Sequence, residues 1–416
     1  MSKIEVEGMH KLHGEVNVQG SKNAVLPILS ACVLNEGETV LFGCPKIRDV
    51  SSMLEALSCA GAKISWEGST LYIDTSVMQP APFIEKAGCM RSSVMLLGSF
   101  LARFGKAILG YPGGCRIGKR PIDLHEQALG AMGAVFCEEE THLEARCNGL
   151  EGCDIYLPYP SVGVTENVIL AASGASGMTR IYGAAREPEI IELCRFLTAM
   201  GIRIYGIGTE KIFVMGGKKQ NYVEYKICPD RIVAGTYLLA VIAARGEVVL
   251  RDAPLEHMKS TIQLAGQMGA KLHRSGMDVN IRMDKKTKPV KFIRTAPYPG
   301  FPTDLQSPLL AALCTAEENS CIEECVFENR FLIVKELLKM GADIYVKNQT
   351  AYISPVEKLF GSELTVKDLR GGAALVVAAL EAEGKTIVDN AEIIFRGYED
   401  ISSDLENLGA VIRTIS

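Results

Sequence analysis

The sequence contains no long apolar segment and no strong excess of either charge. No uncharged apolar run approaches the roughly 18–20 residues that a transmembrane helix requires, and residues 1–14 alternate polar and apolar side chains without the apolar core of a signal peptide. Lysine and arginine total 44 and aspartate and glutamate 49, so the net charge is −5, with both signs mixed along the chain. This balance argues against nucleic-acid and membrane-surface binding. We therefore expect a cytoplasmic protein without a nucleic-acid or membrane partner.

Cysteine is plentiful, but its pattern predicts neither disulfides nor a metal site. The chain has 13 cysteines, and most have apolar neighbours, as in Ala31-Cys32-Val33 and Leu313-Cys314. Such neighbours are typical of reduced thiols in a protein core. Cys321 and Cys325 are close in sequence, but no histidine or second cysteine pair accompanies them, which disfavours a zinc site. We expect no metal and no cofactor.

The chain contains an internal repeat. Six glycines spaced 68 or 72 residues apart each follow a helical pattern and precede an alternating, strand-like run: Gly61, Gly133, Gly201, Gly269, Gly341 and Gly409. Each repeat also predicts an earlier, more apolar helix, at residues 23–34, 92–103, 166–173, 231–244, 305–314 and 371–382. The unit is therefore strand, buried helix, strand, outer helix, strand, strand. Six copies predict an α/β fold with two pseudo-symmetric domains of three units each.

The segment 111–125 carries the strongest sign of chemistry. Cys115 follows two glycines and precedes three cations, which are Arg116, Lys119 and Arg120. Nearby positive charge lowers the pKa of a thiol and favours the reactive thiolate. The same cations suit an anionic substrate, so the segment is interpreted as an active-site loop. The alternative is an ordinary surface loop with a chance cysteine.

Charged residues also recur where helices are expected to begin. Arg48, Arg120 and Arg396 each lie thirteen residues before the glycine of their repeat. Helix N-termini attract anions, and an arginine there is unfavourable unless an anion lies between. If equivalent ends of the units face one cleft, six cations would line it: Lys22, Arg91, Arg120, Arg330, Arg370 and Arg396. The alternative, helix N-caps and structural ion pairs, explains Asp230 and Arg186-Glu187 well.

Eight motifs follow one another along nearly the whole chain. They are Gly20-Ser21-Lys22-Asn23-Ala24, Met90-Arg91-Ser92-Ser93, Pro112-Gly113-Gly114-Cys115 through Arg120-Pro121-Ile122-Asp123-Leu124-His125, Ala185-Arg186-Glu187-Pro188-Glu189-Ile190, Thr295-Ala296-Pro297-Tyr298-Pro299-Gly300-Phe301-Pro302-Thr303-Asp304, Phe327-Glu328-Asn329-Arg330, Asp368-Leu369-Arg370-Gly371-Gly372 and Arg396-Gly397-Tyr398-Glu399. Together they resemble the enolpyruvyl transferases, in particular the branch that acts on a sugar nucleotide. The resemblance implies two inverse α/β barrel domains of three βαβαββ-like units each. We expect one domain at residues 22–229 and the other formed by residues 1–21 and 230–416.

The resemblance also implies a reaction and its two small-molecule substrates. The 3′-hydroxyl of UDP-N-acetylglucosamine adds to C2 of phosphoenolpyruvate, and phosphate is then eliminated. Lys22, Arg120 and Arg396 match the clamp for phosphoenolpyruvate, Asp304 the base, and Cys115 a thiol that donates a proton or assists product release and can bond covalently to phosphoenolpyruvate. The implied catalytic residues are Lys22, Cys115, Asp304, Asp368 and Arg396. The implied substrate-binding residues are Lys22, Asn23, Arg91, Arg120, Pro121, Ile122, Asp123, Leu124, Ser161, Val162, Gly163, Glu187, Asp304, Val326, Arg330, Arg370 and Arg396.

One departure and three alternatives accompany this interpretation. Tyr159-Pro160 stands where some relatives carry Lys-Val, so a lysine contact to the nucleotide diphosphate is missing here. The first alternative is enolpyruvyl transfer to shikimate 3-phosphate, and the second is a catalytically silent paralogue that binds the sugar nucleotide and regulates. The third is a cysteine hydrolase, for which only His125 lies in the Cys115 motif.

Overall fold

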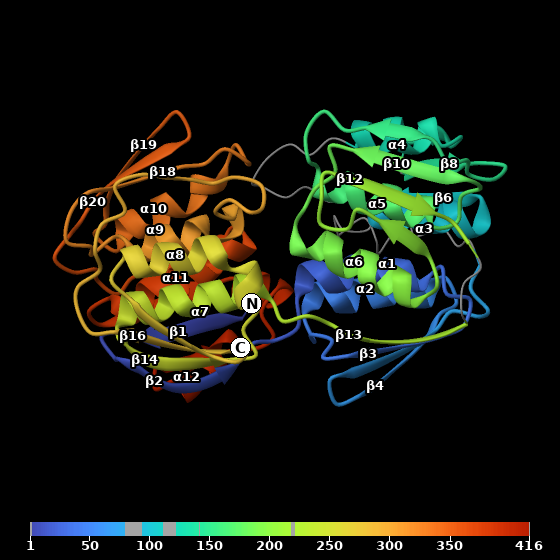
Figure 1. Ribbon diagram of the computed structural model, residues 1–416. Coiled ribbons are helices and arrows are strands. Elements are labelled where there is room, and N and C mark those ends of the chain that lie inside the picture. Colours follow the sequence, from blue (N-terminus) through green and yellow to red (C-terminus); the bar gives the residue numbers. More distant parts are fainter. Residues whose placement is uncertain (1, 80–93, 111–121, 141, 218–220, 416) are drawn as a thin grey trace. The chain divides into compact units, whose positions relative to one another are not determined.

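The computed structural model describes residues 2–79, 94–110, 122–140, 142–217 and 221–415. Contacts divide the described residues into two compact units. Unit 1 comprises residues from 1–19 and 229–416, and unit 2 comprises residues from 20–228. The chain thus starts in unit 1, passes through unit 2 and returns to complete unit 1 (Figure 1).

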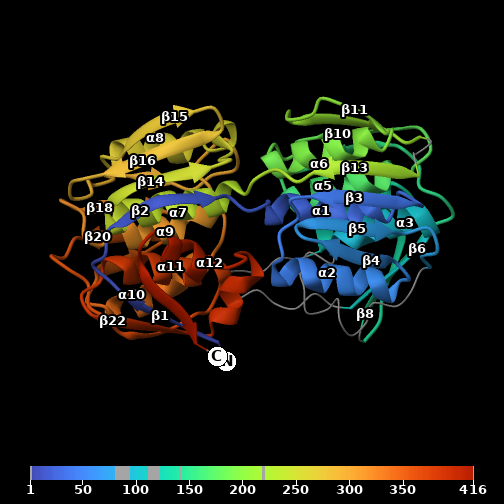
Figure 2. The same cartoon turned by 90° about the horizontal axis from the view of Figure 1, so that it is seen from below.

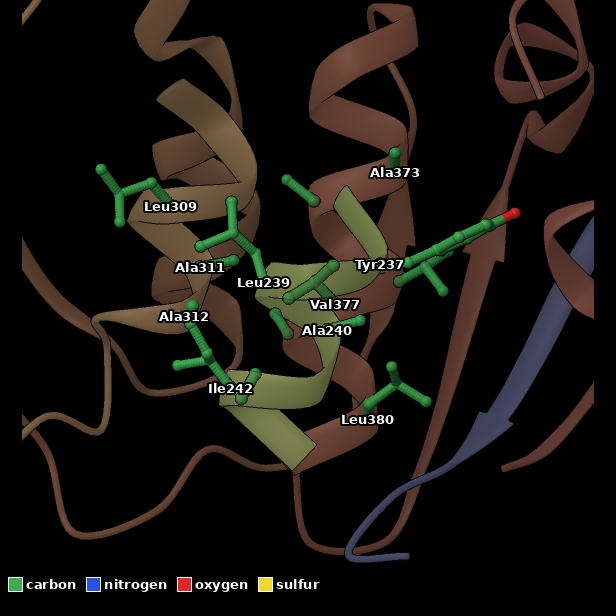
Figure 3. Packing of buried hydrophobic residues seen from close by; sticks show 14 of the residues in the cluster. Tyr237, Leu239, Ala240, Ile242, Leu309, Ala311, Ala312, Ala373, Val377 and Leu380 are labelled. Atoms are coloured by element: carbon green, nitrogen blue, oxygen red, sulfur yellow. The ribbon is translucent and has the colours of Figure 1, made fainter. Parts of the chain in front are cut away.

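Three buried helices form the interior of unit 1. They are α7 (Arg231–Ala244), α9 (Gln306–Ala312) and α11 (Leu369–Glu381), and each packs against the other two. Figure 3 shows their side chains gathered in one cluster, in which Ala240, Ala311 and Ala312 are almost fully buried. Such small side chains let helix backbones approach closely. Because these helices are apolar on nearly every side, burial of the whole helix is what stabilises them.

Three four-stranded sheets pack on these helices. Their strand orders are β15–β16–β14–β2, β17–β18–β20–β19 and β21–β22–β1–β23, and each contains one parallel and two antiparallel pairs. The strands are β1 (Lys3–Glu7), β2 (Leu12–Asn17), β14 (Gly246–Arg251), β15 (Lys271–Ser275), β16 (Asp278–Met283), β17 (Ile293–Arg294), β18 (Ser320–Glu323), β19 (Asp343–Lys347), β20 (Thr350–Ser354), β21 (Glu363–Thr365), β22 (Lys385–Asp389) and β23 (Val411–Ile415). Alternate residues of the strands point into the core, as a two-residue period requires.

Unit 2 repeats this plan. Its buried helices are α1 (Lys22–Cys32), α3 (Leu96–Phe104) and α5 (Val162–Ala172), which pack against one another. The sheets have the orders β13–β3–β5–β4, β11–β12–β10–β9 and β6–β8–β7. The strands are β3 (Glu38–Phe42), β4 (Lys63–Glu67), β5 (Thr70–Asp74), β6 (Lys106–Gly110), β7 (Val135–Glu138), β8 (His142–Arg146), β9 (Asp154–Tyr156), β10 (Met178–Tyr182), β11 (Arg203–Tyr205), β12 (Lys211–Met215) and β13 (Tyr222–Lys226).

The repeat read from the sequence is present in the structure. The outer helices are α2 (Arg48–Cys59), α4 (Asp123–Ala131), α6 (Pro188–Ala199), α8 (Lys259–Gln267), α10 (Val334–Lys339) and α12 (Ile401–Asn407), and short 3₁₀ helices are η3 (Leu255–His257), η4 (Thr303–Leu305), η5 (Arg330–Ile333) and η6 (Ala391–Arg396). Each of the six predicted glycines follows an outer helix with φ between 87° and 102°. Glycine adopts this left-handed conformation at little cost, which ends the helix.

The predicted buried helices correspond to α1, α3, α5, α7, α9 and α11, with errors at the beginnings of two of them. The α-helix α3 begins at Leu96, whereas the prediction placed its beginning at residue 92. The other error concerns α5. The prediction began that helix at residue 166, whereas it begins at Val162. Ser161 is the N-cap, and its hydroxyl accepts a hydrogen bond from the N–H of Val164 at 3.5 Å. The polar side chains of Thr165 and Glu166 therefore lie inside the helix and do not mark its beginning. In the part of the chain that the structure describes, no helix is both long and apolar enough to cross a bilayer.

A carboxyl group is buried at the C-terminal end of α11. Glu381 is 8% exposed, and the Thr315 hydroxyl donates to its Oε2 at 2.7 Å. Its Oε1 has no hydrogen-bond partner among the described residues. Burial raises the pKa of Glu381 to about 8, against smaller lowering effects from the Thr315 hydrogen bond and the charge of Arg245.

We expect Glu381→Gln to stabilise the protein increasingly as the pH rises above about 4.5. Between about pH 4.5, the ordinary value, and pH 8 the unfolded chain loses this proton while the folded chain keeps it. The free energy of unfolding of the wild type therefore falls as the pH rises through this range. Glutamine has no such proton, so the variant should match the wild type near pH 4.5 and exceed it by on the order of 2–4 kcal/mol at pH 8.5.

Denaturant unfolding at pH 4.5 and pH 8.5 measures this difference. Glu383→Gln is the matched control, because Glu383 is exposed and pairs with Lys358. An advantage of Glu381→Gln that is the same at both pH values would contradict the prediction.

Candidate functional site

Asp304 lies between two buried arginines in unit 1. It sits in η4, the turn that leads into α9, and its Oδ2 accepts a hydrogen bond from Arg370 at 3.0 Å. Its Oδ1 pairs with Arg330. The two arginines are only 2% and 4% exposed, whereas the Asp304 side chain is 25% exposed. The structure thus brings three of the predicted site residues, Asp304, Arg330 and Arg370, into one cluster.

The surroundings of Arg370 keep it charged. Burial is the largest single effect and lowers its pKa, but the charges of Asp304, Tyr398 and Asp230 and the hydrogen bond with Asp304 together raise the pKa of Arg370. Its guanidinium lies over the ring of Tyr398, 5.9 Å from the centroid. Its second amino group, Nη1, is buried without a hydrogen-bond partner among the described residues. A buried donor of this kind is costly unless a ligand completes it, and a carboxylate or phosphate oxygen suits a guanidinium best.

Two further aspartates cap the buried helices of unit 1. The Asp230 carboxylate accepts from the N–H groups of Ile232 and Val233 at 2.7 and 3.2 Å. The Asp368 carboxylate accepts from the N–H groups of Arg370 and Gly371 at 3.1 and 2.9 Å. The N-cap alternative therefore describes what these side chains do in the structure. A catalytic role of Asp368 stays a prediction.

Arg396 and Val326, also in unit 1, occupy separate elements. Arg396 is the last residue of η6 and is half-buried. Val326 is 40% exposed and lies in the loop that follows β18. Its N–H donates to the buried carboxylate of Glu324 at 2.8 Å.

In unit 2, the predicted residues at the beginning of α1 each contact an acid. Ser21 caps the helix through the N–H of Ala24. Lys22 Nζ lies 2.8 Å from Oδ2 of Asp49 in the first turn of α2, and both side chains are nearly buried. Asn23 donates to Oε1 of Glu189 at 3.4 Å. The positive charge of Lys22 is therefore held in place by a carboxylate that the sequence analysis did not select.

Three glutamates of unit 2 lie close together, Glu166 inside α5 and Glu187 and Glu189 at the beginning of α6. Glu187 is the N-cap residue of α6, and Glu189 is in its first turn. Burial, followed by the charges of Glu189 and Glu187, raises the pKa of Glu166 well above its ordinary value. Glu187 is thus one of three close carboxyl groups in unit 2.

The remaining described residues of the prediction lie where α4 and α5 begin. Ser161 caps α5, and Val162 and Gly163 are its first residues. Ile122 precedes α4, and Asp123 and Leu124 open it. Next to them, Nδ1 of His125 lies 2.9 Å from Nδ2 of Asn167, so this ring contacts an amide of α5. Arg91, Cys115, Arg120 and Pro121 lie outside the described residues.

Three acidic residues hold predicted site residues but were not themselves predicted. Asp49, Glu189 and Glu324 each contact a predicted site residue or its neighbour. Asp49 directly follows Arg48, which was noted for its spacing, so the neighbouring acid was a usable signal. No local pattern marks Glu324. Among the described residues, no group of three or more histidine, cysteine, aspartate or glutamate side chains is arranged to hold a metal ion.

Comparison with known proteins shows the family to which the chain belongs. The sequence profile of EPSP synthase (3-phosphoshikimate 1-carboxyvinyltransferase) matches residues 6–405. The chain is a member of this family, the enolpyruvyl transferases. It is 45% identical over 415 residues to UDP-N-acetylglucosamine 1-carboxyvinyltransferase 2 of Caldanaerobacter subterraneus subsp. tengcongensis, with 99% of both chains covered. It is 42% identical over 416 residues to UDP-N-acetylglucosamine 1-carboxyvinyltransferase of Halothermothrix orenii, with 100% of both chains covered.

Solved structures agree on the fold. The enolpyruvyl transferase NikO from Streptomyces tendae matches with a TM-score of 0.90 at 23% identity, over 100% of this chain and 99% of that one. EPSP synthase from Acinetobacter baumannii matches with a TM-score of 0.77 at 20% identity over 100% of both chains. The predicted fold class, the α/β fold of the enolpyruvyl transferases, is therefore confirmed.

Proposed function

We propose that this enzyme transfers the enolpyruvyl group of phosphoenolpyruvate to the 3′-hydroxyl of UDP-N-acetylglucosamine and releases phosphate. The observation that supports the chemistry is the carboxylate of Asp304 held by two buried arginines, one of which has a donor without a partner among the described residues. The choice of acceptor is supported by full-length relatives, 40–45% identical, that bear this activity in their names. The reaction would take place in the cytoplasm and open peptidoglycan synthesis.

The proposed reaction has an addition step and an elimination step, and charged side chains act in both. The hydroxyl oxygen of the acceptor bonds to C2 of phosphoenolpyruvate while Asp304 accepts the hydroxyl proton and C3 gains a proton. Loss of phosphate from C2 and of a proton from C3 then leaves the enolpyruvyl ether and inorganic phosphate. Lys22, Arg120 and Arg396 bind the anionic groups of phosphoenolpyruvate, and Cys115 donates a proton or assists product release.

The other predicted residues serve binding in this proposal. Arg91, Arg330 and Arg370 add positive charge for phosphoenolpyruvate and the intermediate. Contacts to the sugar nucleotide come from Asn23, Pro121, Ile122, Asp123, Leu124, Ser161, Val162, Gly163, Glu187 and Val326. Asp368 holds the beginning of α11 and with it Arg370.

Phosphate release with each acceptor tests the proposal. The purified protein is incubated with phosphoenolpyruvate and either UDP-N-acetylglucosamine or shikimate 3-phosphate. We expect phosphate only with the sugar nucleotide. Phosphate only with shikimate 3-phosphate would assign the other branch of the family. Binding of the sugar nucleotide without phosphate release would support a regulatory paralogue.

We expect an electrophile to modify Cys115 before any other cysteine. Cys59 and Cys137 are exposed, but the hydrogen bond and charge of Glu139 raise the pKa of Cys137. Burial raises the pKa of Cys32 and of Cys194 to about 12. Cys115 has three cations beside it in sequence, so its thiolate should form most readily. Treatment with one equivalent of the epoxide fosfomycin should give at least about tenfold more adduct on Cys115 than on Cys59.

Peptide mass spectrometry locates the adduct, and phosphate release measures the loss of activity. Cys59→Ser is the control that should remain fully sensitive, while Cys115→Ser should take up at most about a tenth as much reagent as the wild type. Adducts distributed evenly over several cysteines would contradict the prediction that Cys115 is an activated thiol.

A further inference from the structure

A buried glutamate connects two parts of unit 1 that carry predicted site residues. Glu324 directly follows β18 and is 2% exposed. Its Oε1 accepts from the N–H groups of Val326 and Phe327 at 2.8 and 3.1 Å. Both of its carboxylate oxygens also lie 3.0 Å from the hydroxyl of Thr303. One carboxylate thus binds the Val326–Phe327 loop and the η4 turn together.

Thr303 passes this constraint to Asp304, the next residue. The Thr303 carbonyl accepts from Nε and Nη2 of Arg330, both at 3.2 Å. Arg330 pairs in turn with the Asp304 carboxylate. The Thr303 residue is therefore fixed at its hydroxyl by Glu324 and at its carbonyl by Arg330, and this sets the direction in which the Asp304 side chain leaves the turn.

The Thr303 contact distinguishes this arrangement from a simple loop anchor. The Glu324 carboxylate already closes its own loop, because it accepts from the N–H groups two and three residues on, as the shorter Asp and Asn side chains do in turns. Thr303 lies more than twenty residues earlier in the sequence. Its hydrogen bonds to Glu324 therefore fix the position of the loop relative to η4. A misplacement of a catalytic group by a fraction of an ångström is enough to slow a reaction.

We propose that Glu324 is a positioning residue that couples the Val326–Phe327 loop to the orientation of Asp304. This inference rests on the proposed function, which makes Asp304 the base and places the sugar nucleotide against Val326. Contact of the nucleotide with the loop then acts through Glu324 and Thr303 on the turn that carries the base. Glu324 itself touches neither substrate.

Thr303→Val tests the coupling because it keeps the shape of the side chain and removes only the hydroxyl. We expect kcat for phosphate release to fall about tenfold, since the base is less well oriented. The KM for UDP-N-acetylglucosamine should change less than about twofold, because Glu324 still holds the loop. Thr303→Ser keeps the hydroxyl and should restore most of the lost rate.

Thr315→Val is a matched control within the same unit. It removes an equivalent hydrogen bond from a threonine to a buried glutamate, Glu381. Glu381 is the last residue of the thirteen-residue helix α11, about 18 Å from the end that carries Arg370. Both valine variants should lower the melting temperature by a similar amount. Only Thr303→Val should lower kcat. An equal loss of melting temperature with unchanged kcat in both variants would overturn the inference.

Variants of Glu324 test the loop side of the coupling. Glu324→Ala should raise the KM for the sugar nucleotide and lower kcat together, and Glu324→Gln should recover most of both, because its amide can still accept from the loop and donate to Thr303. If Glu324→Ala does not fold, the comparison of Thr303→Val with Thr315→Val still tests the positioning role. A wild-type protein inactive with UDP-N-acetylglucosamine would refute the proposed function, whereas an active wild type with a fully active Thr303→Val would refute only the positioning role.

Discussion

Asp304→Ala is expected to lower kcat by about two to four orders of magnitude, the usual contribution of a general base. The acceptor hydroxyl is a poor nucleophile, and the variant has no group at this position to take its proton. Arg330 and Arg370 remain, so phosphoenolpyruvate should still bind. Steady-state phosphate release measures kcat, and calorimetric titration measures the affinity for phosphoenolpyruvate.

The same variant leaves two buried guanidinium groups without their carboxylate. Breaking a buried ion pair in this way is destabilising, so the melting temperature should fall. Phosphoenolpyruvate supplies new anionic groups, and it should raise the melting temperature of Asp304→Ala more than that of the wild type. Asp404→Ala controls for the loss of a hydrogen-bonded carboxylate as such, because Asp404 of α12 also accepts a hydrogen bond from a buried side chain, Tyr237. Turnover of Asp304→Ala close to the wild-type rate would reduce Asp304 to a structural partner of the arginines.

Arg370→Met is expected to lower kcat/KM for phosphoenolpyruvate by about two to three orders of magnitude. The variant removes the 3.0 Å hydrogen bond to Asp304 and the buried Nη1 donor that has no partner among the described residues. If that donor binds an anionic group of phosphoenolpyruvate, most of the loss should appear in KM. Arg370→Lys should be intermediate, because lysine keeps the charge but cannot present two donors in a plane.

Substitution of a distant arginine controls for the loss of charge alone. Arg251 forms ion pairs with Glu15 and Asp278 and is half exposed, so Arg251→Met should leave kcat/KM within about twofold of the wild type. A loss of melting temperature in Arg370→Met without a change in kcat/KM would mean that Arg370 only holds Asp304.

The repeat made most of the fold predictable. A glycine in the left-handed region leaves a local mark in the sequence, and the six of them located the outer helices and the strands that follow. The buried helices were found because they are apolar on all sides. The beginning of α5 was misplaced because Ser161 resembles a loop residue until its contact with the N–H of Val164 is known.

The site was less predictable, because its contacts join residues far apart in the chain. Asp304 was found through its motif, but its partners are 26 and 66 residues away. No periodicity links such positions. Polar residues at helix beginnings served as a signal for both N-caps and binding groups, and Asp368 shows why sequence alone does not separate them. Glu324 and Glu381 are buried by tertiary packing that no short window of sequence contains.

The order of strands in one sheet also governs how the chain reaches this structure. Strand β1 lies between β22 and β23 in its sheet, and Figure 2 shows it beside β22. Lys3 lies opposite Asp389 of β22 and Ile415 of β23. During synthesis on the ribosome, residues 3–7 emerge long before their partners, because β22 and β23 begin only at Lys385 and Val411. Unit 2 can fold before β22 and β23 are synthesised, whereas both edges of β1 remain unpaired and accessible to other chains. The charged side chains of Lys3 and Glu5 lie on this unpaired strand. Such charges disfavour pairing of the strand with a strand of another chain. Because β1 begins beside the end of β23, with Lys3 opposite Ile415, a short linker could join the two strands in a circular permutant. Such a chain would synthesise β1 directly after β23 and close to β22 in sequence.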